Sequence, residues 1–159
     1  MNIQLYRIDD RLIHGQVVIG WASVLQSEKI ILCDDEVMAN DWEKELYLSC
    51  VPETLETLIL DEEHAAELLT HADPDPANAI FLVKGPEVIE HLLARGVTFS
   101  TVNVGGIHYK EGRRNYLSYL YLSDEEVASF KRCMQKGVRF ECLDVPTGHK
   151  VDLREVLHT

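Results

Sequence analysis

The chain has 159 residues, of which 46% are hydrophobic and 26% charged, a balance typical of a globular domain. Its formal net charge is −12, from 27 acidic and 15 basic residues, which disfavours non-specific binding to nucleic acid or to an anionic membrane surface. The first residues lack the layout of a signal peptide, and no apolar stretch approaches the roughly 20 residues that span a bilayer. We therefore expect a cytoplasmic protein without a membrane-inserted segment.

The length favours one domain over residues 1–159, since no linker, repeat or low-complexity tract divides the chain. The four cysteines show no C-x-x-C spacing, so zinc knuckles and redox motifs are unsupported. We expect buried thiols in a reducing compartment.

Short apolar runs alternate with amphipathic stretches from end to end. The segments 30–32 and 80–83 are apolar without interruption, which is typical of strands covered on both faces. Proline at position 86 suits a first helical turn, and Ser123 with Glu126 forms a capping-box pattern. We predict strands at 3–8, 29–33, 57–60, 79–83, 98–104, 116–122 and 139–143, and helices at 16–25, 41–50, 62–71, 86–94 and from 123 to a stop at Gly137.

This alternation predicts an α/β fold with a doubly wound, mostly parallel sheet of about seven strands and helices on both faces. In such folds, ligands gather in the loops that follow the carboxyl ends of the strands. The loops of interest are therefore 9–14, 34–40, 84–85 and 105–112.

The first of these loops lies within the stretch IDDRLIHGQV, residues 8–17. At a strand-to-helix junction, the backbone N–H groups after His14 are free donors and the helix dipole favours an anion. Gly15 leaves room for a bulky group, and the planar fork of Arg11 suits phosphoryl oxygens. Imidazole is largely neutral and nucleophilic at cytoplasmic pH, and Asp9 or Asp10 could orient its ring. These residues indicate a histidine that accepts a phosphoryl group.

A plainer interpretation of the same loop stays open. A lone histidine in a loop is usually a solvated or capping residue, the two aspartates could simply end a strand, and Arg11 could simply pair with them. Residue types and spacing alone leave the two interpretations about equally supported.

The segment RIDDRLIHGQV, residues 7–17, resembles the signature of the enzyme IIB component of the mannose/fructose/sorbose-type bacterial sugar phosphotransferase system. The resemblance continues in order through most of the chain, at residues 33–41, 103–106, 110–112, 122–126 and 145–147.

The resemblance implies that His14 takes a phosphoryl group from a phosphohistidine on a IIA component. It then passes the group to a sugar held by the membrane components IIC and IID, which is the activity of a protein-N(pi)-phosphohistidine–sugar phosphotransferase. Asp10 would orient His14, Arg11 would stabilise charge, and Gly15 and Gln16 would bind the phosphoryl group. No cofactor or metal is needed, and the family suggests a homo-oligomer. The sugar is not specified by this chain.

The loop 105–112 supplies further candidates. Gly105 and Gly106 either admit a phosphoryl group close to the backbone or merely make a turn. Lys110 and Arg113 belong to the one basic cluster and could contact the phosphoryl group or the IIA partner, although a solvated face is equally consistent. His108 is a second imidazole that could assist the chemistry, but it is more simply a polar loop residue.

Two alternative functions are considered. The first is a regulatory phosphoprotein or binding module of the same family that transports no sugar. The second is a receiver-type signalling domain, in which Asp9, Asp10, Asp61 and Lys84 would form an acidic pocket with Mg²⁺. The receiver interpretation leaves His14 and its neighbours without a role.

Overall fold

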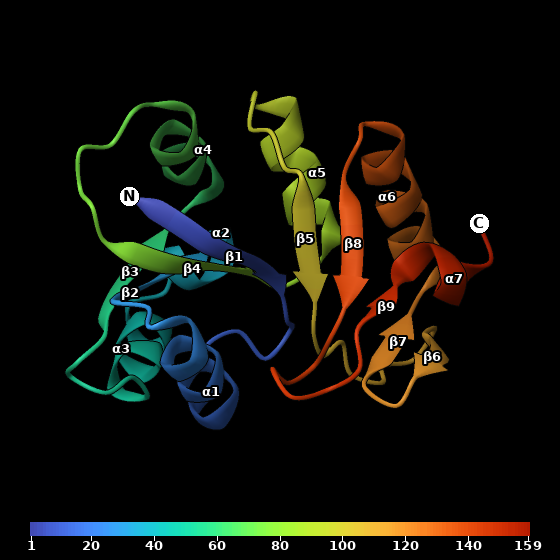
Figure 1. Cartoon of the computed structure of the whole chain (residues 1–159), viewed down its shortest axis with the longest axis horizontal. Coiled ribbons are helices and arrows are strands. Elements are labelled where there is room, and N and C mark those ends of the chain that lie inside the picture. The colour runs from blue at the N-terminus through green and yellow to red at the C-terminus, as the bar shows by residue number, and fades with distance from the viewer.

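A computed structural model describes residues 1–159, with the side chains of Gln16 and Val17 outside the description. Its central sheet has seven strands in the order β3-β2-β4-β1-β5-β8-β9, all parallel except β9 (Figure 1). The predicted class, a mostly parallel α/β sheet of about seven strands, is confirmed. The strands of this sheet are β1 (Asn2–Ile8), β2 (Lys29–Cys33), β3 (Glu56–Leu60), β4 (Asn78–Val83), β5 (Thr101–Val104), β8 (Arg139–Cys142) and β9 (Val151–Asp152).

Helices connect most of these strands, and β6 (Arg114–Leu117) and β7 (Leu120–Leu122) form a separate antiparallel hairpin. Among the described helices, none combines the length and the apolar character that crossing a bilayer would require. The helices are α1 (Gly15–Leu25), α2 (Asp35–Met38), α3 (Asp41–Ser49), α4 (Glu62–Thr70), α5 (Pro86–Ala94), α6 (Asp124–Gln135) and α7 (Leu153–Leu157).

The sheet separates two hydrophobic clusters, as a doubly wound fold requires. Successive side chains of a strand point to opposite faces, so Ile31 and Cys33 of β2 join one cluster and Ile30 and Leu32 join the other. The first cluster contains residues of α4, α5, α6 and α7, and the second contains residues of α1 and α2. Because both faces are covered, β2 and β4 are almost wholly apolar.

The strand order defines where a ligand would bind. From the central strand β1 the chain runs through α1 to β2, on one side of β1, whereas from the neighbouring strand β5 it runs on to β8, on the other side. Adjacent strands whose connections leave in opposite directions form a switch point, and ligands of open α/β sheets bind at its carboxyl side. The loops 9–14 and 105–113, here called the switch-point loops, follow the carboxyl ends of β1 and β5.

Side-chain caps begin most of the helices. The carboxylates of Asp34 and Asp61 and the amide oxygen of Asn40 accept backbone N–H groups three residues ahead. At α6, the Ser123 hydroxyl accepts the Glu126 N–H and the Glu126 carboxylate accepts the Ser123 N–H, so the predicted capping box is confirmed.

We expect Ser123→Ala to lower the free energy of unfolding by about 1 kcal/mol, because a first-turn N–H of α6 loses its acceptor. Urea denaturation followed by circular dichroism measures the change. Ser23→Ala, an exposed position within α1, is the matched control and should leave stability unchanged or slightly raised. Equal losses in the two variants would contradict a specific role for the cap.

The predicted strand 116–122 is wrong. The chain reverses after Leu117, and Leu117 pairs with Leu120 across a two-residue turn. The alternation of apolar and aromatic residues is the same for one strand and for two, and Ser118–Tyr119 contains none of the Gly, Asn or Asp residues that two-residue hairpin turns favour. Strand β9 instead completes the seven, and β9, α2 and α7 are too short to produce a periodic sequence signal.

Candidate phosphoryl-transfer site

His14 lies at the junction between β1 and α1. After β1, the Leu12 N–H donates to the Asp9 carbonyl at 3.0 Å, which turns the chain, and Leu12 takes a positive φ of 58°. A branched side chain at positive φ is uncommon and strained, and such strain is concentrated at functional sites. Leu12 and Ile13 are buried in the cluster under α1, so they anchor the loop, while His14 is exposed.

His14 is the N-cap residue of α1, with extended backbone angles and no side-chain capping hydrogen bond. Its carbonyl accepts the Val18 N–H at 2.9 Å, and helix geometry gives the first N–H groups of α1 no intrahelical acceptor. A Cβ added at Gly15 would meet nothing within 4 Å, so the space beside the helix start is open. Gln16, a predicted phosphoryl-binding residue, has its side chain outside the described residues.

Two arginines share one buried carboxylate at the end of β1. Arg11 donates from Nε to Oδ1 of Asp9 at 3.1 Å and from Nη2 to Oδ2 at 3.0 Å. Arg7 donates from Nη2 to the same Oδ2 at 3.1 Å. The Arg7 and Asp9 side chains are each 1% exposed, whereas Arg11 is 28% exposed. This Arg7–Asp9–Arg11 triad therefore extends from the buried Arg7 to the partly exposed Arg11 in the loop that contains His14.

Arg7 also holds the ends of β5 and β8. Its Nη1 donates to the Asn103 side-chain oxygen and to the Leu143 carbonyl at 2.9 Å, and its Nη2 donates to the Asp144 carbonyl at 2.8 Å. The guanidinium lies 5.3 Å from the centre of the Trp21 ring, within cation–π range. One buried side chain thus connects β1, β5, the loop after β8 and α1.

The triad keeps Asp9 ionised despite its burial. Burial alone raises the pKa of the Asp9 carboxyl, but hydrogen bonds from Arg11 and the charges of Arg7 and Arg11 outweigh it, so the pKa lies below its usual value. Burial lowers the pKa of Arg7, and the charge of Asp9 opposes this effect. All three groups are therefore charged at neutral pH.

Gly105 and Gly106 provide room for the two arginines. A Cβ at Gly105 would lie 2.2 Å from Nη2 of Arg7, and one at Gly106 would lie 3.1 Å from Nη2 of Arg11. The Gly105 N–H donates to the Ile8 carbonyl, and the Gly106 carbonyl accepts the Asp10 N–H. The two glycines therefore let the switch-point loops pack together over guanidinium groups, and their role in phosphoryl binding stays a prediction.

Asp10 connects the switch-point loops through its side chain. Its Oδ1 lies 2.6 Å from Nδ1 of His108, and its Oδ2 accepts the His108 N–H at 2.9 Å. Arg113 donates from Nη1 to Oδ2 of Asp10 at 3.4 Å and to the His108 carbonyl at 2.9 Å. The carboxylate thus contacts the second imidazole, and orientation of His14 by Asp10 stays a prediction.

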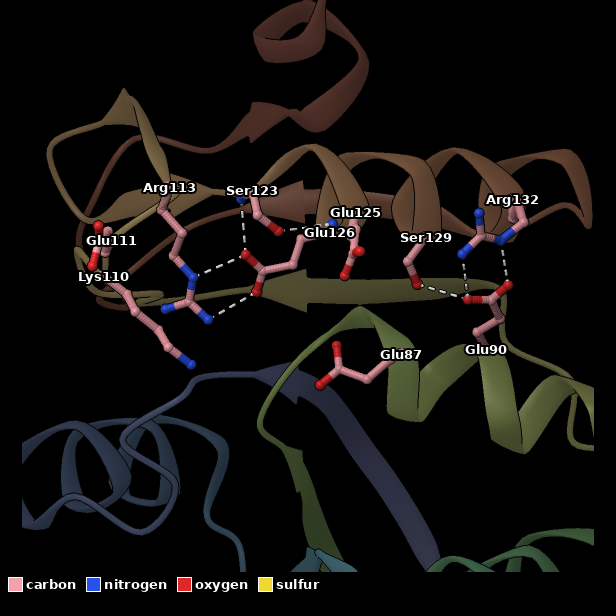
Figure 2. A pocket seen from close by; sticks show the side chains of 10 residues that line it. All are labelled: Glu87, Glu90, Lys110, Glu111, Arg113, Ser123, Glu125, Glu126, Ser129 and Arg132. Carbon is pink, nitrogen blue, oxygen red and sulfur yellow. Dashed lines mark hydrogen bonds and ion pairs between the residues drawn. The ribbon is translucent and has the colours of Figure 1, made fainter.

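A charged cleft of about 440 Å³ lies beyond Arg113, between α5 and α6. Arg113 donates from Nε and Nη2 to the Glu126 carboxylate, and Lys110 and Glu87 extend into the cleft (Figure 2). Lys110 is exposed on this wall, so the structure places it with the cleft, and its contact with a phosphoryl group stays a prediction.

Arg7 and Asn103 are the parts of the site that the sequence analysis missed. Arg7 enters the sequence prediction only as the first residue of the family signature, and Asn103 only as part of a later segment. The available signal is a charged side chain and an amide side chain near the ends of two predicted strands, since such groups are buried only with polar partners.

The receiver-type pocket does not form. Asp61 follows β3, the edge strand, and β2 and β4 lie between β3 and β1. Asp61 instead caps α4 and pairs with His64, and the Lys84 ammonium lies 3.6 Å from both Asp34 and Glu36. The acidic residues proposed for that pocket therefore belong to separate parts of the sheet.

The fold and the switch-point loops define a class of protein, namely a doubly wound α/β protein with an exposed histidine and an arginine–carboxylate triad at its switch point. The family model for the sorbose subfamily IIB component of the phosphotransferase system (PTS) matches residues 3–159. The chain therefore belongs to the sorbose subfamily of PTS IIB components, a family of phosphotransferases.

Individual relatives agree with this assignment. The fructose-specific EIIB component of Bacillus subtilis is 30% identical over 157 residues, which cover 99% of this chain and 96% of that one. The mannose-specific EIIAB component of Escherichia coli is 28% identical, and the chain spans only 49% of it. The crystal structure of the IIBSor domain of the Klebsiella pneumoniae sorbose permease aligns with a TM-score of 0.91 at 25% identity, covering 99% of this chain and 97% of that one.

Proposed function

We propose that this chain is a cytoplasmic phosphocarrier, a single IIB domain in which His14 accepts a phosphoryl group from the phosphohistidine of a IIA component. It then passes the group to a sugar bound by membrane IIC and IID components. The observation that carries the proposal is the exposed His14 at the start of α1, three residues after Arg11, which is held on a buried carboxylate.

The chemistry consists of two displacements at phosphorus. In the first, the lone pair of a ring nitrogen of His14 forms an N–P bond as the donor's N–P bond breaks, and the electron pair leaves with the donor imidazole. In the second, a sugar hydroxyl oxygen forms an O–P bond as the His14 N–P bond breaks, and the hydroxyl proton passes to a base.

Arg11 and the start of α1 are suited to the charge that moves in these steps. Phosphoryl transfer places most of the charge on the three equatorial oxygens, so positioned donors supply most of the catalysis. The guanidinium of Arg11, with the backbone N–H groups from Gly15 onward, would supply them, while Asp10 would fix the loop through His108. No metal or cofactor takes part.

A thiol is the competing nucleophile, and the structure disfavours three of the four. Cys33, Cys133 and Cys142 are buried, and burial raises the pKa of each thiol, that of Cys133 to about 11 and that of Cys142 to about 12. Cys50 is exposed, contrary to the expectation of buried thiols, but it follows α3 on the connection to β3, and β2 and β4 separate β3 from β1 in the sheet. These features support His14 as the acceptor.

The EIIAB relative, in which A and B components share one chain, supports a IIA partner, and the acidic chain suits a partner with a basic docking face. A homo-oligomer is also part of this proposal.

The experiment incubates the protein with a phosphorylated IIA component and measures intact mass. We expect a phosphoryl adduct in the wild type, in His108→Ala and in Cys50→Ser, and none in His14→Ala. The adduct should be lost in acid and survive in base, as a phosphohistidine does.

The contrary outcomes are specific. An adduct that remains in His14→Ala but disappears in Cys50→Ser would make the protein a phosphocysteine carrier. An adduct at His14 that no membrane fraction containing IIC and IID can discharge to a sugar would favour the regulatory alternative.

A further inference from the structure

The Arg7–Asp9–Arg11 triad carries an excess positive charge beside the loop of His14. Two guanidinium groups share a single carboxylate, and Oδ2 of Asp9 accepts Nη2 of both at 3.1 and 3.0 Å. Asp144 and Asp10 lie within Coulombic range of Arg11, but neither forms an ion pair with it among the described side chains. Asp10 is instead engaged by His108 and Arg113.

Arg11 also has a hydrogen-bond donor to spare. It uses Nε and Nη2 on Asp9, and its Nη1 has no partner among the residues that the structure describes. If Arg11 were the only partner of Asp9, the two side chains would form a neutral ion pair. The carboxylate would then neutralise the positive charge of Arg11 that attracts phosphoryl oxygens. Arg7 forms an ion pair with the same carboxylate from the buried side. Asp9 therefore neutralises less of the positive charge of Arg11.

We propose that Arg7 is a positioning residue for phosphoryl transfer, which acts through Asp9 to keep Arg11 oriented and still able to bind phosphoryl oxygens on His14. This inference rests on the proposed function. Arg7 itself is buried and does not touch the phosphoryl group. Its effect is electrostatic, and its four hydrogen bonds to Asn103, Asp9 and the two carbonyls keep its charge in place.

A charge-rescue experiment separates this role from a merely structural one. Arg7→Met leaves a neutral Asp9–Arg11 pair, and we expect phosphoryl acceptance from phosphorylated IIA to slow about tenfold or more. Arg7→Met/Asp9→Asn restores one net positive charge, and we expect its rate to return to within about threefold of the wild type. A structural role predicts that the double variant is as slow as the single one, or slower.

Two further variants complete the design. Lys29→Met, which removes a cation that pairs with Glu56 and Asp75 at the amino end of β2, is the matched control and should keep the wild-type rate. If Arg7→Met does not fold, Arg7→Gln and Arg7→Lys replace it. If Asp9 is shared between the two arginines, Arg7→Gln should accept the phosphoryl group slowly, and Arg7→Lys should accept it at close to the wild-type rate. Equal rates in the Gln and Lys variants would overturn the inference.

A second measurement does not depend on the carrier function. Inorganic phosphate is titrated into ¹⁵N-labelled protein while the Gly15 amide and the Arg11 Nε–H are followed. We expect phosphate to bind the wild type and the double variant more tightly than Arg7→Met. If the wild type accepts no phosphoryl group but this order holds, only the proposed function fails. If phosphate does not bind, or binds Arg7→Met equally well, the inference is overturned.

Discussion

Asp9→Asn should lower the free energy of unfolding at neutral pH by about 3–5 kcal/mol, the usual cost of removing one partner from a buried ion pair. The substitution keeps the size of the side chain but removes the carboxylate with which both Arg7 and Arg11 form ion pairs. Arg7 is 1% exposed and cannot recover hydration, so its charge would remain buried without a paired carboxylate. Chemical denaturation at pH 7 measures the loss.

Glu56→Gln is the matched control, because Glu56 is an exposed partner of Lys29 and Asp75 remains to pair with that lysine. We expect it to change stability by less than about 0.5 kcal/mol.

The Arg7–Asp9–Arg11 triad also predicts the stability of a double variant. Arg7→Met added to Asp9→Asn should recover part of the lost stability, since it removes the buried charge that the first substitution leaves unpaired. A loss below about 1 kcal/mol in Asp9→Asn would show that the triad does not hold these loops.

The same variant has a defined dependence on pH. The folded-state pKa of Asp9 is depressed, so the stability that its ionised form contributes is fully present above the unfolded value of about 3.9. That stability is lost as the pH falls through the lower folded-state value. The difference between the wild type and Asp9→Asn should therefore be constant near neutral pH and narrow under acid conditions. A difference that widens as the pH falls would contradict the assignment.

Much of this fold could be predicted from local sequence signals. The apolar runs at β2 and β4 and the capping box at α6 each determine one element without reference to the rest of the chain. The loop with His14 was also predictable, since a strand-like run that changes to a helical pattern places the intervening residues at the carboxyl end of a strand. The hairpin of β6 and β7 was not predictable from local signals, because the position of its turn depends on tertiary packing.

The interior of the candidate site lay beyond such signals. The spacing of Asp9, Asp10 and Arg11 does not indicate which aspartate holds the arginine, because Asp10 is engaged by His108, which is 98 positions away in the chain. Gly105 and Gly106 looked like a turn or an approach to phosphate, but their requirement comes from two arginine side chains that pack against them. Contacts between distant segments decide these roles.

Gly105→Ala should cost about 2–4 kcal/mol of folding stability, because its methyl group would occupy the position of the Arg7 guanidinium. The added Cβ would lie 2.2 Å from Nη2, 2.4 Å from Cζ and 2.9 Å from Nη1. A flexible side chain usually moves aside, but Arg7 is buried and donates to four acceptors, so any movement breaks buried hydrogen bonds. Denaturation in urea at neutral pH measures the change.

Two other glycines test this reasoning. Gly20→Ala, within α1 and with nothing within 4 Å of an added Cβ, should raise stability by about 0.5–1 kcal/mol through helix propensity. Gly106→Ala should cost less than Gly105→Ala, because its Cβ would lie 3.1 Å from Arg11, which is 28% exposed and can shift. If Gly105→Ala proved as stable as the wild type, Arg7 could leave its acceptors at little energetic cost. Arg7 would then not be held rigidly, which its interaction with Asp9 in the triad requires.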